Sequence, residues 1–230
     1  MKETVAAVIV AAGSGKRMGL QVKKQYLMIE EYPVLYYSLK AFSDYGVEKI
    51  VLVVPEEDIE YCKEHIVNKY GFCDIVQVVA GGKERYDSVL AGLEKVNEDY
   101  VLIHDGARPC ISINLIERCV QAVKKYKACI LSVPVKETIK VINEEGFIVD
   151  TPNRSHVWLA QTPQAFDTAL LKQAYTYTIT KEMAITDDAM MVEHFLKIPV
   201  KVVEGEYTNI KITTKEDIRI ATDYLREQNS

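Results

Sequence analysis

The chain has 230 residues, of which 48% are hydrophobic and 27% charged, and its net charge is −5. This composition is typical of a globular protein with room for one large domain or two small ones, and its mild acidity disfavours non-specific nucleic-acid binding, which relies on many phosphate contacts. No apolar run reaches the roughly 18 residues of a membrane span and no signal-peptide pattern opens the chain, so we expect a cytoplasmic protein without membrane partners.

Apolar runs and helical periodicities alternate along the first part of the chain. Short, β-branched runs predict strands at 5–10, 50–54, 75–79, 100–103 and 128–133. Helical spacing predicts a helix after each of the first four strands, at 33–45, 58–70, 85–96 and 114–126. This alternation is typical of a Rossmann-like α/β fold, with a mostly parallel central sheet and helices on both faces.

The alternation breaks at about 134–155. Residues 138–142 and 147–151 flank a polar turn and predict a protruding β-hairpin arm. An isolated hairpin is seldom stable, so we expect the arm to pack on a second subunit of a homodimer. Later patterns predict strands at 157–159, 200–203 and 210–213 and helices at 168–177, 187–195 and 215–226. No linker is visible, so we expect a single domain over 1–230 with the arm as an insertion.

A glycine-rich, cationic stretch follows the first strand. Gly13 and Gly15 allow backbone N–H groups to approach phosphate oxygens, and Arg17 and Lys24 supply positive charge. The stretch is neither a P-loop nor a dinucleotide fingerprint, because neither glycine spacing is met. The turns at 81–82 and 105–108 also follow strands, so all three should converge on one crevice at the carboxyl ends of the strands.

Residues 11–18 and 24–27 resemble the signature of the sugar-phosphate nucleotidylyltransferases, and more narrowly that of the 2-C-methyl-D-erythritol 4-phosphate cytidylyltransferases. The resemblance continues, in the family's order, through 87–89, 104–109, 133–138, 161–164, 186–187 and 209–211. It implies transfer of CMP from CTP to methylerythritol phosphate with release of pyrophosphate, in non-mevalonate isoprenoid precursor synthesis. It also implies Mg²⁺, or another divalent cation, on the triphosphate.

The resemblance also implies a role for individual residues. It places three cationic side chains on the triphosphate and the charge that develops during transfer: Arg17, Lys24 and Lys211. It implies that the nucleotide is bound by Ala11, Ala12, Gly13, Gly15, Gly82, Ser88 and Asp105. Asp105 is also a candidate metal ligand. It assigns the polyol phosphate to Arg108, Thr138, Arg154, Thr162 and Thr186.

One position departs from the family pattern. The family commonly has proline before the lysine that matches Lys24, and this chain has Lys23. A lysine there could change the rigidity of the loop or add a phosphate contact. We expect the change to leave the role of Lys24 intact.

Several alternatives stay open at this stage. A ribitol 5-phosphate cytidylyltransferase would share the fold, the nucleotide and the loop, although residues 136–140 and 158–162 favour methylerythritol phosphate. A non-catalytic nucleotide-binding module is a further alternative. Asp105 and Arg108 could simply pin their turn, and His104 is expected to be buried rather than catalytic. The five cysteines lack metal-binding spacing and are expected to be reduced thiols.

Overall fold

A seven-stranded sheet forms the centre of the computed structural model, which describes residues 3–13, 23–177 and 185–228. The strand order is β11-β7-β10-β6-β1-β4-β5. The strands are β1 (Val5–Val10), β4 (Lys49–Val54), β5 (Val76–Ala80), β6 (Tyr100–Asp105), β7 (Ala128–Pro134), β10 (Trp158–Asp167) and β11 (Lys201–Glu204). All neighbours are parallel except β10, which is antiparallel to β6 and β7. The predicted mostly parallel sheet is thereby confirmed.

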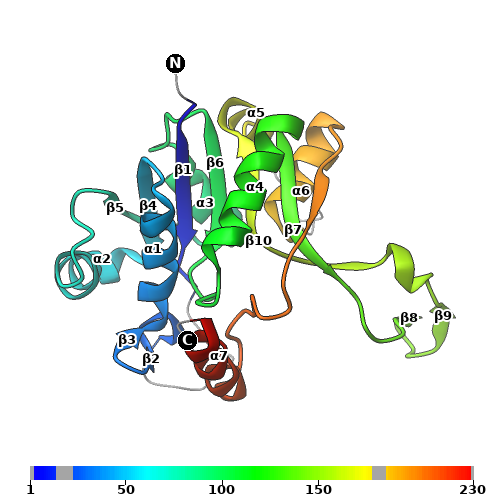
Figure 1. Cartoon of the computed structure of the whole chain (residues 1–230). Helices are drawn as coiled ribbons and strands as arrows, with labels where there is room; N and C mark the ends of the chain where they lie inside the picture. Colours follow the sequence, from blue (N-terminus) through cyan, green and yellow to red (C-terminus); the bar gives the residue numbers. More distant parts are fainter. Residues whose placement is uncertain (1–2, 14–22, 178–184, 229–230) are drawn as a thin grey trace.

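Helices cover both faces of this sheet, as predicted (Figure 1). One face carries α1 (Val34–Tyr45), α2 (Ile59–Cys62), the π-helical turn Lys63–Asn68 that continues α2, and α4 (Ile113–Tyr126). The other face carries α3 (Arg85–Leu93), α5 (Thr168–Ala174), α6 (Asp188–Met191) and the π-helical turn Val192–Leu196. The apolar run of β1 explains both layers, because Ala7 and Ile9 pack in the first core and Ala6 and Val8 in the second.

A third, smaller core lies where β1 ends. There α7 (Lys215–Gln228) packs against the β2–β3 hairpin (Met28–Ile29 and Tyr32–Pro33), and Figure 1 shows α7 below the tip of β1. Asp217 holds the start of α7, because its carboxylate accepts hydrogen bonds from the backbone N–H groups of Thr213 and Thr214. The last helix is therefore anchored beside the carboxyl ends of the strands.

The predicted arm is present but its paired strands are shorter than expected. They are β8 (Val141–Ile142) and β9 (Ile148–Asp150), which pair only over a few residues. The arm projects from the end of β7, away from the body (Figure 1). Its apolar side chains are exposed, including Phe147 at 67% and Ile148 at 61%.

Two predicted strands need correction. The strand expected at 157–159 extends to Asp167 as β10, because a register shift between Ala160 and Gln164 accommodates Pro163, which has no N–H to donate. The strand expected at 210–213 does not form, because the Ile212 N–H donates to the carbonyl of Ala107 in the turn after β6. Both errors concern segments whose backbone partners are distant in sequence.

The described residues contain no helix that is long and apolar enough to cross a membrane. All five cysteines are free thiols, as predicted, and four of them are buried.

Candidate active site

The strand order reverses between β1 and β6, which makes the carboxyl ends of these two strands the expected position of a binding crevice. From β1 the chain continues to β4 and β5, which lie in sequence on one flank of β1 within the sheet. It then returns to β6, which lies on the other flank of β1. Val10 and Asp105, the last residues of β1 and β6, are register partners. Ligands of open α/β sheets bind outside the carboxyl ends of the strands at such a switch point. The turns that begin at Ala11, Gly81 and Gly106 lie at this one edge, because their N–H groups donate to the carbonyls of Val53, Val54 and Val10, so the prediction is confirmed for the described starts of the turns.

The start of the nucleotide loop lies at this switch point. Ala11 continues β1 and accepts a hydrogen bond on its carbonyl from Gln25 Nε2, at 2.8 Å. This bond closes the base of the loop, because Ala11 and Gln25 lie on its two sides in sequence. Gly13 is exposed, and among the described residues no atom lies within 4 Å of the point where a Cβ would stand. Gly15 and Arg17 lie outside the described residues, so their predicted roles stay predictions.

The second glycine turn packs directly on the first. A Cβ on Gly81 would lie 2.6 Å from the Cβ of Ala12, which explains the need for glycine there. The Gly82 N–H donates to the hydroxyl of Ser88, at 3.1 Å, and Ser88 is buried at the start of α3. The predicted nucleotide residues Ala12, Gly82 and Ser88 thus belong to one packed wall.

Asp105 is the electrostatic centre of the crevice. Its carboxylate lies 2.7 Å from Lys211 Nζ, 3.4 Å from Arg85 Nε and 3.8 Å from Arg108 Nε. Burial acts to raise the pKa of this carboxyl, but the attraction of Arg85, Lys211 and Arg108 is stronger and holds the pKa well below its usual range. Asp105 is therefore ionised, and it holds cations from three separate segments around one point.

Lys24 lies near the N-terminal end of the sequence, but its side chain reaches the segment that contains Lys211. It begins a 3-10 turn, Lys24–Tyr26, and its ammonium donates to the carbonyl of Ile212, at 2.9 Å. Ile212 follows Lys211 in sequence and is fully buried. The structure therefore brings together two predicted catalytic lysines that the sequence separates by 187 positions.

Arg108 contributes an unsatisfied donor. Its Nη1 donates to the carbonyl of Asn209 at 2.7 Å, whereas its buried Nε has no hydrogen-bond partner among the described residues. Burial is the main cause that lowers the pKa of this guanidinium. This Nε faces the Asp105 carboxylate at 3.8 Å, so Arg108 is held by an ion pair on one side and by the Asn209 carbonyl on the other.

Arg85 is a site residue that sequence reasoning missed. Its guanidinium forms two hydrogen bonds with Asp188, at 3.0 and 2.7 Å, and also contacts Asp105. Tyr175 donates a third hydrogen bond to the fully buried Asp188. Burial acts to lower the pKa of Arg85, but Asp188 and Asp105 outweigh it and raise the pKa. The only local signal was an arginine opening a helix after the Gly81-Gly82 turn.

His104 and Thr162 support Asp105 from inside the protein. His104 is fully buried, and one ring nitrogen lies 3.3 Å from the carbonyl of Arg108 and therefore donates. The other nitrogen then accepts from the Thr162 hydroxyl, which in turn accepts from the Asp105 N–H. Desolvation lowers the pKa of His104 to about 4. His104 is thus a neutral, hydrogen-bonded core residue, as predicted, and the Thr162 hydroxyl has two internal partners.

The remaining predicted substrate residues lie at the edges of the crevice or on the arm. Thr186 is exposed just before α6, where Asp187 caps the helix by accepting from the Met190 N–H. Thr138 is exposed on the arm, and Arg154 is exposed at its base, where it donates to the Lys136 carbonyl at 3.4 Å. Their contacts with substrate stay predictions.

Sequence comparisons show the family of the chain. The sequence model of IspD, 2-C-methyl-D-erythritol 4-phosphate cytidylyltransferase, matches residues 5–227. The enzyme of that name from Lachnoclostridium phytofermentans is 50% identical over 98% of this chain and 97% of the relative. The enzyme of that name from Lachnospira eligens is 44% identical over 96% of this chain and 98% of its own length.

Solved structures give the same result. The 4-diphosphocytidyl-2C-methyl-D-erythritol synthase of Anaerococcus prevotii is 36% identical, with a TM-score of 0.86 over 97% of this chain and 96% of that one. The Thermus thermophilus 2-C-methyl-D-erythritol 4-phosphate cytidylyltransferase is 30% identical, with a TM-score of 0.76 over 95% and 98% of the two chains. The chain belongs to the 2-C-methyl-D-erythritol 4-phosphate cytidylyltransferase family, and is a nucleotidyltransferase that transfers CMP from CTP to methylerythritol phosphate in the non-mevalonate route.

Proposed function

We propose that the transfer is a direct displacement that Lys24 and Lys211 promote by charge, together with Arg17. An oxygen of the methylerythritol phosphate forms a bond to the α-phosphorus of CTP. The bond from that phosphorus to the oxygen shared with the β-phosphate breaks, and pyrophosphate leaves. The attacking phosphate is already an anion, so no general base is needed, and catalysis rests on alignment and electrostatic stabilisation.

The meeting of Lys24 and Lys211 is the observation that carries this mechanism. The Lys24 ammonium bonds the carbonyl next to Lys211, and the Lys211 ammonium bonds Asp105 at the switch point. Two lysines on opposite sides of a phosphoryl group oppose the repulsion between two anionic reactants, which is the main barrier to this reaction. A site that only bound nucleotide would have little use for both.

The nucleotide fits the wall formed by the two glycine turns. Ala12, Gly13 and Gly82 would offer backbone groups at close range to cytosine and ribose. Ala11 fixes the start of this wall through its bonds to Val53 and Gln25, and Ser88 supports the second turn. Selection of a pyrimidine would come from a pocket too small for a purine. Asp105 serves the ribose or the metal at the end of this wall.

Asp105 could bind a magnesium ion only together with the triphosphate, which would supply the other ligands. Among the described parts of the chain, no three His, Cys, Asp or Glu side chains gather into a metal site. Mg²⁺ is commonly bound by one or two carboxylates together with substrate phosphates, and Asp105 is a carboxylate in the crevice. When bound, the ion would neutralise triphosphate charge, and Lys211 and Arg108 would add to that effect.

The polyol phosphate then approaches from the arm side of the crevice. The guanidinium of Arg108, which is held beside Asp105 in the crevice, is the proposed phosphate contact there. Thr162 and Thr186 lie on β10 and just before α6, while Thr138 and Arg154 lie on the arm. We infer a cytoplasmic homodimer of single-domain chains in which the exposed apolar face of the arm packs on the partner, and in which Thr138 and Arg154 reach the partner's crevice.

A paired assay tests the choice of substrate. With CTP and Mg²⁺, we expect pyrophosphate release with methylerythritol phosphate and little or none with ribitol 5-phosphate. Release with ribitol 5-phosphate alone would overturn the assignment in favour of the related cytidylyltransferase. The absence of release with both would contradict the nucleotidyltransferase mechanism itself.

A further inference from the structure

Asp58 holds the two residues that enclose Lys24 and Gln25 in the sequence. Lys23 Nζ lies 2.9 and 2.8 Å from the two carboxylate oxygens of Asp58, and the Tyr26 hydroxyl donates to one of the same oxygens at 2.9 Å. Asp58 lies just before α2 and its side chain is only 14% exposed. One carboxylate thus fixes both ends of a four-residue segment.

The two inner residues of this segment are held from the opposite direction. Lys24 donates to the Ile212 carbonyl and Gln25 to the Ala11 carbonyl, both on the crevice side. The segment therefore alternates between bonds to Asp58 and bonds to the nucleotide wall. Rotation of the 3-10 turn would break contacts on both sides, so Asp58 limits the directions that the Lys24 ammonium can take.

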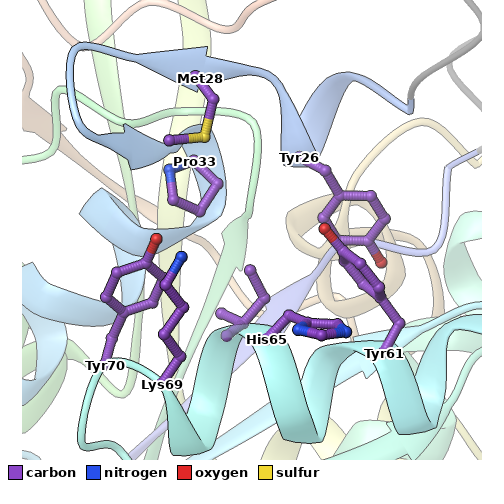
Figure 2. A pocket seen from close by; sticks show the side chains of 8 residues that line it. Tyr26, Met28, Pro33, Tyr61, His65, Lys69 and Tyr70 are labelled. Carbon is purple, nitrogen blue, oxygen red and sulfur yellow. The ribbon is translucent and has the colours of Figure 1, made fainter.

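Tyr26 makes this anchor rigid. Its hydroxyl also lies 3.1 Å from Cys62 Sγ, and its ring meets that of Tyr61 at 5.0 Å with an interplanar angle of 62°. Figure 2 shows the Tyr26 ring beside that of Tyr61 at one end of a pocket of about 200 Å³, which His65 also lines. The anchor is thus built on a packed helix surface.

Lys23 is committed to this anchor and not to phosphate. Its ammonium has three donors, and it contacts three carboxylate oxygens, since Glu57 Oε1 lies at 2.9 Å in addition to the two oxygens of Asp58. Burial acts to lower the pKa of Lys23, but the hydrogen bonds of Asp58 and Glu57 outweigh it and raise the pKa. A lysine at this position could change the rigidity of the loop or add a phosphate contact, and the geometry supports the effect on rigidity.

We propose that Asp58 is a positioning residue, which acts through Lys23 and Tyr26 to hold Lys24 in line with the triphosphate. This rests on the proposed role of Lys24. The backbone of Lys23 has φ −63°, which is the value that a proline ring imposes. The Lys23 backbone is therefore compatible with the proline of the family pattern, and in this chain the Lys23–Asp58 ion pair restrains the same turn through a side chain.

The test compares Lys23→Ala, Asp58→Asn and Lys23→Pro. We expect the first two to lower kcat about tenfold, because a small displacement of a catalytic group is costly, with the KM for CTP nearly unchanged. The double variant Lys23→Ala/Asp58→Asn should be little worse than either single one. Lys23→Pro should keep kcat within about twofold of the parent, because its ring supplies the same φ. Lys63→Ala, which removes an exposed ion pair with Glu60 at 2.8 Å, is the matched control and should change nothing.

A second readout separates this proposal from the role of Lys24. The Tyr26 and Leu27 amides donate to the carbonyls of Lys23 and Lys24, so their hydrogen exchange reports on the turn. We expect faster exchange in Lys23→Ala and Asp58→Asn than in Lys24→Ala, which keeps the bonds of Lys23 and Tyr26 to Asp58. If Lys24→Ala loses activity while the other two variants keep both kcat and slow exchange, Asp58 does not position Lys24. If Lys24→Ala itself stays active, the proposed mechanism fails.

Discussion

The crevice around Asp105 and the β8–β9 arm differ most in what their side chains contact. In the crevice, Asp105 is buried and meets cations from α3, the turn after β6 and the segment before α7. In the arm, Phe147, Ile148 and Val149 are all more than 60% exposed. The partners of Asp105 all lie within the described part of this one chain, whereas the arm presents apolar surface that only another surface can bury.

The largest effect should come from breaking the buried part of the crevice. Arg85→Ala leaves Asp188 buried and unpaired, so we expect the free energy of unfolding to fall by about 3–5 kcal/mol. Arg118→Ala is the control, because Arg118 pairs with Glu206 at a similar distance of 2.8 Å but both side chains are 36–40% exposed. It should cost about 1 kcal/mol or less. Equal losses in urea unfolding would show that burial does not distinguish the two pairs.

Acid should lower the free energy of unfolding through protonation of His104. The pKa of this buried imidazole falls from 6.5 to about 4 on folding, so the unfolded chain binds more protons and stability is lost as pH falls from about 6.5 to about 4. The full loss approaches about 3 kcal/mol. Asp105 has a lowered pKa and adds its own loss only as pH falls below its usual range near 4.

Unfolding in urea between pH 7 and pH 4 measures this loss. His104→Gln should flatten the slope between pH 6.5 and 4, since Thr162 and Arg108 would then face a group that does not titrate. An unchanged slope in the variant would assign the acid sensitivity to other groups.

A substitution in the arm should weaken dimer formation rather than the folding of the chain. Phe147→Glu removes an exposed aromatic residue from the proposed dimer contact, and burial of such a side chain contributes about 2 kcal/mol. We expect a weaker dimer in sedimentation and an unchanged unfolding midpoint of the monomer. Ile113→Glu, at the exposed start of α4, is the control. A parental dimer that tolerates Phe147→Glu would place the interface elsewhere.

A mixing experiment tests whether arm residues act across the dimer. Arg154→Ala and Lys211→Ala proteins should each be poorly active alone. If Arg154 serves the partner's crevice, one site of each mixed dimer is intact, and random exchange should restore about a quarter of parental activity. No recovery after confirmed subunit exchange would mean that Arg154 acts within its own chain.

Much of the crevice was predictable because its signals are local. Strand runs that end in glycine turns or in Asp105 predict a shared edge, and the alternation of strands and helices predicts which edge it is. Arg85 was missed because its partner Asp188 lies 103 residues away, and no local pattern reports such a pair. The position of β10 between β6 and β7 was missed for the same reason, and its polar stretch around Pro163 does not look like a strand.

Single-turnover transfer with Lys24→Ala and Lys211→Ala tests the mechanism most directly. By analogy with the loss of one oxyanion donor, each substitution should slow CMP transfer about 10²–10³-fold, or about 3–4 kcal/mol. Because both lysines act on one phosphoryl group, the double variant should lose less than the product of the two single effects. Lys215→Ala, exposed at the start of α7, should transfer at the parental rate. Parental transfer rates in both single variants would contradict catalysis by paired charge across the crevice.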